Sequence, residues 1–256
     1  MQWIHRVKPE WLVARKDYLT ASEIMKLLPT TPTGRPRAGL DDALMKVWAY
    51  KQAEVSEDDV ISTGVMARGH IMEPYALEAL NKTGLLPFTM YHWDDTLIHS
   101  ADGIAVSPDS LDVEQPADCP VSLAGCDATQ VVEIKAYNAA AHYEAGMTTS
   151  LGMLPERWQL ATAMYVMPTI MGGHLVFFNP NVVHPLFVHS FTRSDLEAEL
   201  EMIKEIKAKY WSSASELAND AYALCDEDIA DACRLETDII KELLDIEAAD
   251  GSCLNP

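Results

Sequence analysis

A carboxylate and an ammonium stand two residues apart in the apolar segment 130–137, at Glu133 and Lys135. Side chains alternate across a strand, so both groups should emerge on the same face. Burying such a pair is costly unless something compensates it, and a divalent cation facing an acidic substrate would do so. Alone, the Glu-x-Lys pattern also fits an ordinary strand edge, so other segments must decide between these readings.

A second acid, Asp102, lies in another short apolar run and is followed by Gly103. The preceding pair Asp94–Asp95 predicts a tight turn between two strands. We therefore expect Asp102 to lie on a strand over 97–106. That strand would neighbour the one that carries Glu133.

The surrounding elements follow from periodicity and from turn residues. Helices are expected at 24–28, 40–52, 66–81, 139–147 and 155–167, with a kink or restart at Pro74. Strands are expected at 86–93, 97–106, 130–137, 173–179 and 185–192, and two or three acidic helices follow from Asp195. This order predicts an α/β (α+β) core, in which a mixed central sheet is flanked by helices, with an acidic helical C-terminal extension.

Length and composition set further bounds. The chain has 256 residues, and its 48% hydrophobic content is ample for a core. The sequence has no apolar run near the length of a membrane span, and its first residues lack the layout of a signal peptide. Five irregularly spaced cysteines fit neither a disulfide framework nor a metal knuckle, so a cytoplasmic location is expected. We expect a catalytic domain over 1–210 and the acidic extension over 211–256.

The charge is polarised along the chain. The formal net charge is −20, which argues at first against a nucleic-acid partner. However, residues 1–52 hold nine Lys and Arg against five acids, whereas residues 193–256 hold 17 acids against six basic residues. Such a chain can hold DNA in a confined channel while the rest of its surface repels it.

Six segments, in order, resemble the phage lambda exonuclease (YqaJ-type) branch of the PD-(D/E)xK nucleases, over about residues 11–210. The resemblance implies a PD-(D/E)xK restriction-endonuclease-like core. The matching residues are Arg15 with Leu19-Thr20-Ala21-Ser22-Glu23, Arg68-Gly69 with Glu73, Ser100-Ala101-Asp102-Gly103, Val132-Glu133-Ile134-Lys135, Gln159 five residues before Met164, and Phe178-Asn179-Pro180.

The resemblance also implies catalytic roles. Asp102 and Glu133, with the Ile134 carbonyl, would bind Mg²⁺, for which Mn²⁺ could substitute. Lys135 would orient or deprotonate the attacking water and stabilise the pentacovalent phosphate. Two more residues would assist: Glu73 would bind a second metal ion through water or hold the nucleophile, and Gln159 would position Lys135 or a metal-bound water.

One metal assignment has a competitor. Asp109, in Ser107-Pro108-Asp109-Ser110-Leu111, also resembles a family pattern and shortens the gap to Glu133 from 31 residues to 24. Asp102 is preferred because Gly103 matches the family glycine and because Asp109 follows Pro108 in what reads as a wet turn. Asp109 stays the alternative.

The resemblance implies a pocket for a terminal 5′-phosphate, formed by Arg15, Ser22 and Ser100, with Arg35 or Arg37 as further candidates. His70, three residues before Glu73, is interpreted as an ordinary polar residue of a helix.

The implied function is a metal-dependent 5′→3′ exonuclease that acts on double-stranded DNA ends in phage-type recombination. The family forms ring-shaped trimers and works with a single-strand annealing protein, so both a homotrimer and that partner are expected. Two alternatives stay open. One is a RecB-like or restriction-type endonuclease, and the other is an acidic protein that binds DNA ends without turnover.

Overall fold

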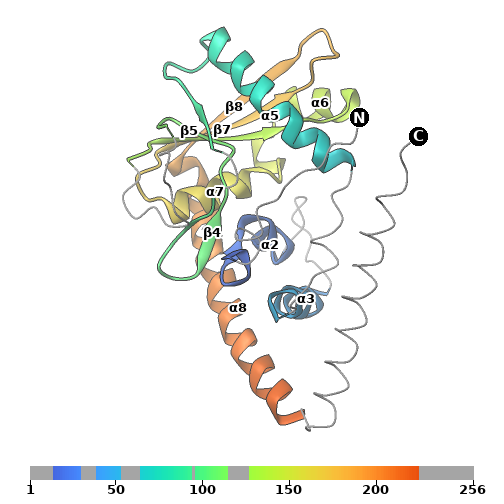
Figure 1. The fold of residues 1–256 in the computed structure, drawn as a ribbon, viewed down its shortest axis with the longest axis vertical. Helices are drawn as coiled ribbons and strands as arrows, with labels where there is room; N and C mark the ends of the chain where they lie inside the picture. The colour runs from blue at the N-terminus through green and yellow to red at the C-terminus, as the bar shows by residue number, and fades with distance from the viewer. Residues whose placement is uncertain (1–13, 30–38, 53–63, 94–95, 115–126, 225–256) are drawn as a thin grey trace, which may run out of the picture. The chain divides into compact units, whose positions relative to one another are not determined.

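The computed structural model describes residues 14–29, 39–52, 64–93, 96–114 and 127–224. By its internal contacts the chain forms two compact units, Met1–Tyr210 and Trp211–Pro256. The described part of the first unit holds two β-sheets and the helices that cover them (Figure 1). Several expectations lie outside the described residues: those for Arg35, Arg37, the Asp94–Asp95 turn, the five cysteines and any helix beyond Leu224.

The larger sheet is mixed, as predicted. Its strands, in spatial order, are β2 (Tyr91–His92), β5 (Ser110–Leu111), β6 (Gln130–Lys135), β7 (Gly172–Phe178) and β8 (Leu186–Thr192). β6 and β7 pair in parallel, whereas the other three pairs are antiparallel. The central strands read as nearly continuous apolar runs because both of their faces are covered.

Helix α5 (Gly64–Thr83) covers one face of this sheet. It is one helix through Pro74, so of the kink or restart expected there the restart is excluded. Its apolar side chains recur at helical spacing and pack on the residues of β6 and β7 that face the helix. Each fully buried Leu or Ile adds about 1.5–3 kcal/mol to the free energy of unfolding. The buried side chains of this cluster include Ala76, Leu77, Leu80, Met90, Val132, Ile134, Val176 and Phe178.

Helix α7 (Arg157–Val166) covers the opposite face. Leu160 and Met164 come so close to β7 that a Cβ added to Gly173 would lie 3.0 Å from Met164 Cε. Because Val131, Glu133 and Lys135 alternate with the residues under α5, they face the α7 side. Figure 1 shows α5 and α7 on opposite sides of the sheet.

A smaller sheet holds β1 (Leu19–Thr20), β4 (Ile104–Val106) and β3 (Ile98–His99) in that order. β3 and β4 form a hairpin, so the single strand expected over 97–106 is wrong. Its turn places Gly103 at φ 91°, a conformation that glycine adopts without the Cβ penalty. The dipeptide Asp102–Gly103 is therefore a hairpin turn with the residue types that such turns favour.

The remaining helices follow their capping residues. α2 (Ala21–Lys26), expected at 24–28, begins with a capping box formed by Thr20 and Glu23. α3 (Leu40–Gln52) matches its expected bounds. α6 (Ala139–Gly146) is capped by Asn138, whose side chain accepts from the Ala141 backbone N–H at 3.0 Å. The short η1 (Leu151–Met153) precedes α7.

The described C-terminal part forms η2 (Arg193–Leu196) and then one helix, α8 (Glu197–Leu224). A capping box formed by Thr192 and Asp195 begins η2. Within the described residues, no helix is both long and apolar enough to cross a membrane.

Candidate active site

Strand β6 presents the acid and the base that the sequence singles out. Glu133 is 7% exposed, and the Lys135 ammonium donates a hydrogen bond to its Oε1. Burial disfavours the ammonium, but the carboxylates of Glu133 and Asp109 outweigh this effect and raise the pKa of Lys135. The strand alternation thus places a charged pair on a sheet face that is otherwise covered by apolar residues.

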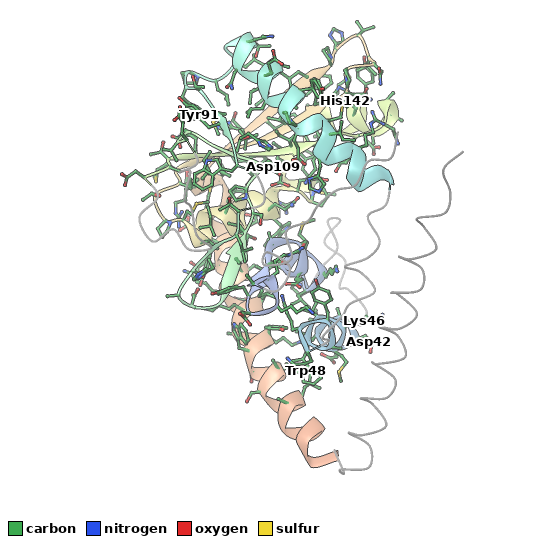
Figure 2. All side chains as sticks on the ribbon, viewed as in Figure 1. Asp42, Lys46, Trp48, Tyr91, Asp109 and His142 are labelled. Atoms are coloured by element: carbon green, nitrogen blue, oxygen red, sulfur yellow. The ribbon has the colours of Figure 1, made fainter. Side chains whose placement is uncertain are left out.

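Asp109 joins this pair from the neighbouring strand. Ser110, the first residue of β5, pairs with Val132 in an antiparallel register. Asp109, which directly precedes β5, therefore comes next to Glu133. Its Oδ2 accepts from the Ile134 backbone N–H at 2.6 Å. Figure 2 labels Asp109 within the layer of the larger sheet. Burial, and then the charges of Glu133 and Glu73, raise the pKa of Asp109 well above its usual range.

The Ile134 carbonyl faces the same side. The N–H and C=O of one strand residue point toward the same neighbour, and this N–H points to Asp109 rather than into the β6–β7 ladder. The carbonyl of Ile134 is therefore directed toward Asp109, on the side of β6 that β5 occupies. Two carboxylates and one backbone carbonyl meet there.

Glu73 approaches from α5, on the first sheet face. His70 Nδ1 lies 3.3 Å from its Oε1, and His92 Nε2 lies 3.9 Å from its Oε2. Burial would raise the pKa of the Glu73 carboxyl, but hydrogen bonds from the two histidines outweigh it and lower that pKa to about 2. Glu73 is thus held ionised and is close enough to Asp109 to raise the pKa of that residue.

Helix α7 supplies polar groups from the second face. Gln159, a predicted site residue, is half-buried on the first turn, and its backbone N–H donates to the backbone carbonyl of Glu156. Glu156 is 8% exposed and accepts a hydrogen bond from the Tyr137 hydroxyl. Burial, and then the bond to Glu156, raise the pKa of the Tyr137 hydroxyl, which stays a donor.

Asp102 and Ser100, both predicted as site residues, lie elsewhere. The Asp102 carboxylate is 42% exposed and accepts from Lys207 Nζ and from the Tyr165 hydroxyl, both at 2.6 Å. The Ser100 hydroxyl donates to Asp102 in the hairpin turn and lies 3.2 Å from the Ile104 carbonyl oxygen. The preference for Asp102 over Asp109 is therefore corrected: Asp102 is part of a turn, and the structure brings Asp109 beside Glu133.

The two remaining phosphate candidates lie on either side of β1, with Arg15 in the helical turn before it and Ser22 in α2. Ser22 is exposed, and its hydroxyl lies 3.2 Å from that of Thr20. The backbone carbonyl of Arg15 accepts from Lys51 Nζ at 2.8 Å, and Lys51 is also paired with the buried Glu23 at 2.8 Å. Since α2 packs against α7, this corner borders the helix that carries Gln159.

Carboxylates dominate the charge of the site. Three carboxylates, those of Glu133, Asp109 and Glu156, act on the ammonium of Lys135, and Glu73 acts on Asp109, so carboxylates outnumber the ammonium within the described residues. Among the same residues, no group of three or more His, Cys, Asp or Glu side chains is arranged so that it could hold a metal ion. Two carboxylates and one carbonyl, with water at the other positions, suit the hard Mg²⁺ ion, which retains several waters.

The sequence reading missed Tyr137, Glu156 and His92. Tyr137 had a signal, because it continues the two-residue spacing of Glu133 and Lys135. Glu156 directly precedes the helix of Gln159, but nothing in the local sequence indicates its burial.

Comparisons with known proteins agree with this architecture. The sequence profile of the YqaJ-like viral recombinase domain matches residues 10–169. The fold is similar to the alkaline exonuclease LHK-Exo from Laribacter hongkongensis, with 19% identity over 85% of this chain and 100% of that chain and a TM-score of 0.61. LHK-Exo in complex with dAMP gives 21% identity, the same coverage and a TM-score of 0.58.

A phage related exonuclease from Haemophilus somnus 129PT is also similar in fold. It is 10% identical over 80% of this chain and 96% of that chain, with a TM-score of 0.54. A comparison with curated protein sequences finds no match.

Proposed function

Given that this chain belongs to the YqaJ-like viral recombinase family, we propose that it is a metal-dependent exonuclease acting on double-stranded DNA ends. The observation that carries the proposal is the meeting of Asp109, Glu133 and Lys135 where β5 begins beside β6. Burial and the charges of neighbouring carboxylates raise the pKa of Asp109, so its ionised form needs a cation beside it, and the backbone of DNA supplies the acidic substrate.

Asp109 and Glu133, with the Ile134 carbonyl, would hold Mg²⁺, or Mn²⁺ in its place. When bound, the ion would act as a Lewis acid on the scissile phosphate and offset charge on the leaving oxygen. Asp109 takes over the role first given to Asp102, because its carboxylate lies against β6.

The other side chains act on the reactants. Lys135, held beside Glu133, would donate hydrogen bonds to the attacking water or to the phosphate as negative charge develops. Glu73, fixed by His70 and His92, would hold the water or a second hydrated ion. Gln159 would help to position Lys135 from the first turn of α7.

We assign 5′→3′ polarity to a phosphate pocket at Arg15 and Ser22. The basic balance of residues 1–52 supports this location for a terminal 5′-phosphate. Ser100 is left out of the pocket because its hydroxyl is engaged within the hairpin turn. LHK-Exo was crystallised with dAMP, which fits a pathway that releases mononucleotides. A homotrimer and a single-strand annealing protein complete the proposed recombination role.

The test uses linear and covalently closed circular duplex DNA of one sequence, each with Mg²⁺ or with EDTA. We expect acid-soluble nucleotide from the linear DNA with Mg²⁺, and from neither DNA with EDTA. Cleavage of the circle would favour an endonuclease. End binding without any turnover would favour the non-catalytic alternative.

A further inference from the structure

The carboxylate of Glu156 is buried, but only one of its two oxygens has a hydrogen-bond partner among the described residues. Its Oε1 accepts from the Tyr137 hydroxyl, while its Oε2 is buried and makes no hydrogen bond to any described residue. Tyr137 is itself anchored, because its backbone carbonyl accepts from the side chain of the buried Asn179 at 2.9 Å. Buried polar atoms of proteins are nearly always paired, so an unpaired carboxylate oxygen calls for a partner.

Lys135 is the cation that can supply this partner. Its ammonium has three N–H donors, and among the described residues the bond that it donates goes to Glu133. Its side chain is 22% exposed and flexible, so it is free to turn. Glu156 also acts electrostatically on Lys135, and its hydrogen-bond partner Tyr137 lies two residues after Lys135 in the chain.

Metal binding changes the position of the ammonium. Under the proposed function, Glu133 binds a divalent cation, which competes for the carboxylate oxygens and repels the Lys135 charge. An ammonium that leaves Glu133 must find another acceptor in this partly buried pocket or lose its compensation. The open Oε2 of Glu156 offers that acceptor.

We propose that Glu156 is the second acceptor of the Lys135 ammonium, and that Lys135 turns from Glu133 to Glu156 when a divalent cation binds. This inference rests on the proposed function for its cation. It makes Glu156 a positioning residue that acts through Lys135, and it gives Tyr137 the task of fixing the carboxylate.

The test is a double-mutant cycle on Mg²⁺ affinity, measured by calorimetry without DNA. The variants are Glu156→Gln, Lys135→Met and their combination. In the parent background, Glu156→Gln should weaken Mg²⁺ binding about tenfold, because the second acceptor of Lys135 then carries no negative charge. In the Lys135→Met background, the same change should cost less than about threefold, since only a distant charge is lost.

Two controls make the cycle specific. Glu144→Gln removes the same charge from an exposed position on α6 and should leave the affinity unchanged. Glu156→Asp keeps the charge on a shorter arm and should give a smaller loss that again depends on Lys135. It also serves if Glu156→Gln does not fold, which thermal unfolding in EDTA would reveal.

The outcomes separate the inference from the proposed function. Equal losses in both backgrounds would overturn the inference alone, because Glu156 would then act without Lys135. A parent protein that binds no Mg²⁺ would overturn both the inference and the proposed metal-dependent function.

Discussion

Asp109→Asn should abolish Mg²⁺-dependent cleavage, whereas Asp102→Asn should leave it intact. Asparagine keeps the oxygen that accepts from the Ile134 N–H, so the strand contact at 2.6 Å survives the change. What is lost is the negative charge beside Glu133. Changes to groups that merely support a metal ligand cost about 10- to 100-fold, so losing a ligand should lower the rate by more than about 100-fold.

The same substitution should stabilise the metal-free protein. Burial and the charges of Glu133 and Glu73 raise the pKa of Asp109, which means that the ionised carboxylate is unfavourable there. Removing this charge should raise the free energy of unfolding in EDTA by about 1 kcal/mol, a gain typical of substitutions that stabilise a protein at the cost of its function. For a unit of this size that gain raises Tm by about 2–4 °C.

Asp102→Asn is the matched control. Hydrogen bonds from Lys207, Ser100 and Tyr165 outweigh the effect of burial and lower the pKa of Asp102 to about 2. Its carboxylate is 42% exposed, so solvent screening limits the loss of stability to about 1 kcal/mol or less. Nucleotide release and thermal unfolding, each with Mg²⁺ and with EDTA, measure both variants. An active Asp109→Asn protein beside an inactive Asp102→Asn protein would refute the reasoning.

Three more predictions follow from the same structure. Lys135→Ala should lower turnover more than about 100-fold while DNA-end binding, measured by fluorescence anisotropy, persists; residual activity above about a hundredth would contradict its role. The parent protein should degrade 5′-phosphorylated linear DNA faster than 5′-hydroxyl linear DNA, and Arg15→Ala should erase this preference. Equal rates of the parent protein on the two substrates would contradict the assignment of the phosphate pocket. Burial lowers the pKa of His174 to about 4, so the unfolded chain binds the proton first as the pH falls. The free energy of unfolding should therefore fall by about 3 kcal/mol as the pH drops from about 6.5 to 4. Urea unfolding of His174→Gln should lose this pH dependence, and an unchanged dependence would mean that another group causes it.

Periodicity and turn residues were enough to predict the longer elements, such as α3, α7, β6 and β7, and the shared face of Glu133 and Lys135. The strand that contains Glu133 and Lys135 lies within one or two residues of its expected bounds, and alternation correctly placed both side chains on one face. Such features depend on neighbours in the sequence. They are therefore readable from a short window.

The rest of the site depends on pairing and packing between distant segments. The run around Asp102 is apolar like a strand, yet Gly103 at positive φ turns it into a hairpin. Asp109 reaches the site through the register of β5 on β6, which no local pattern specifies. The burial of Glu156 depends on where α7 packs, and it is likewise invisible in the local sequence.

Anomalous diffraction from crystals grown with Mn²⁺ tests the central claim most directly, because it locates the metal without reference to activity. We predict a peak between the carboxylates of Asp109 and Glu133, within coordination distance of the Ile134 carbonyl oxygen. A peak at Asp102 in the hairpin turn, or no peak at the start of β5 in a protein that degrades DNA, would contradict the account.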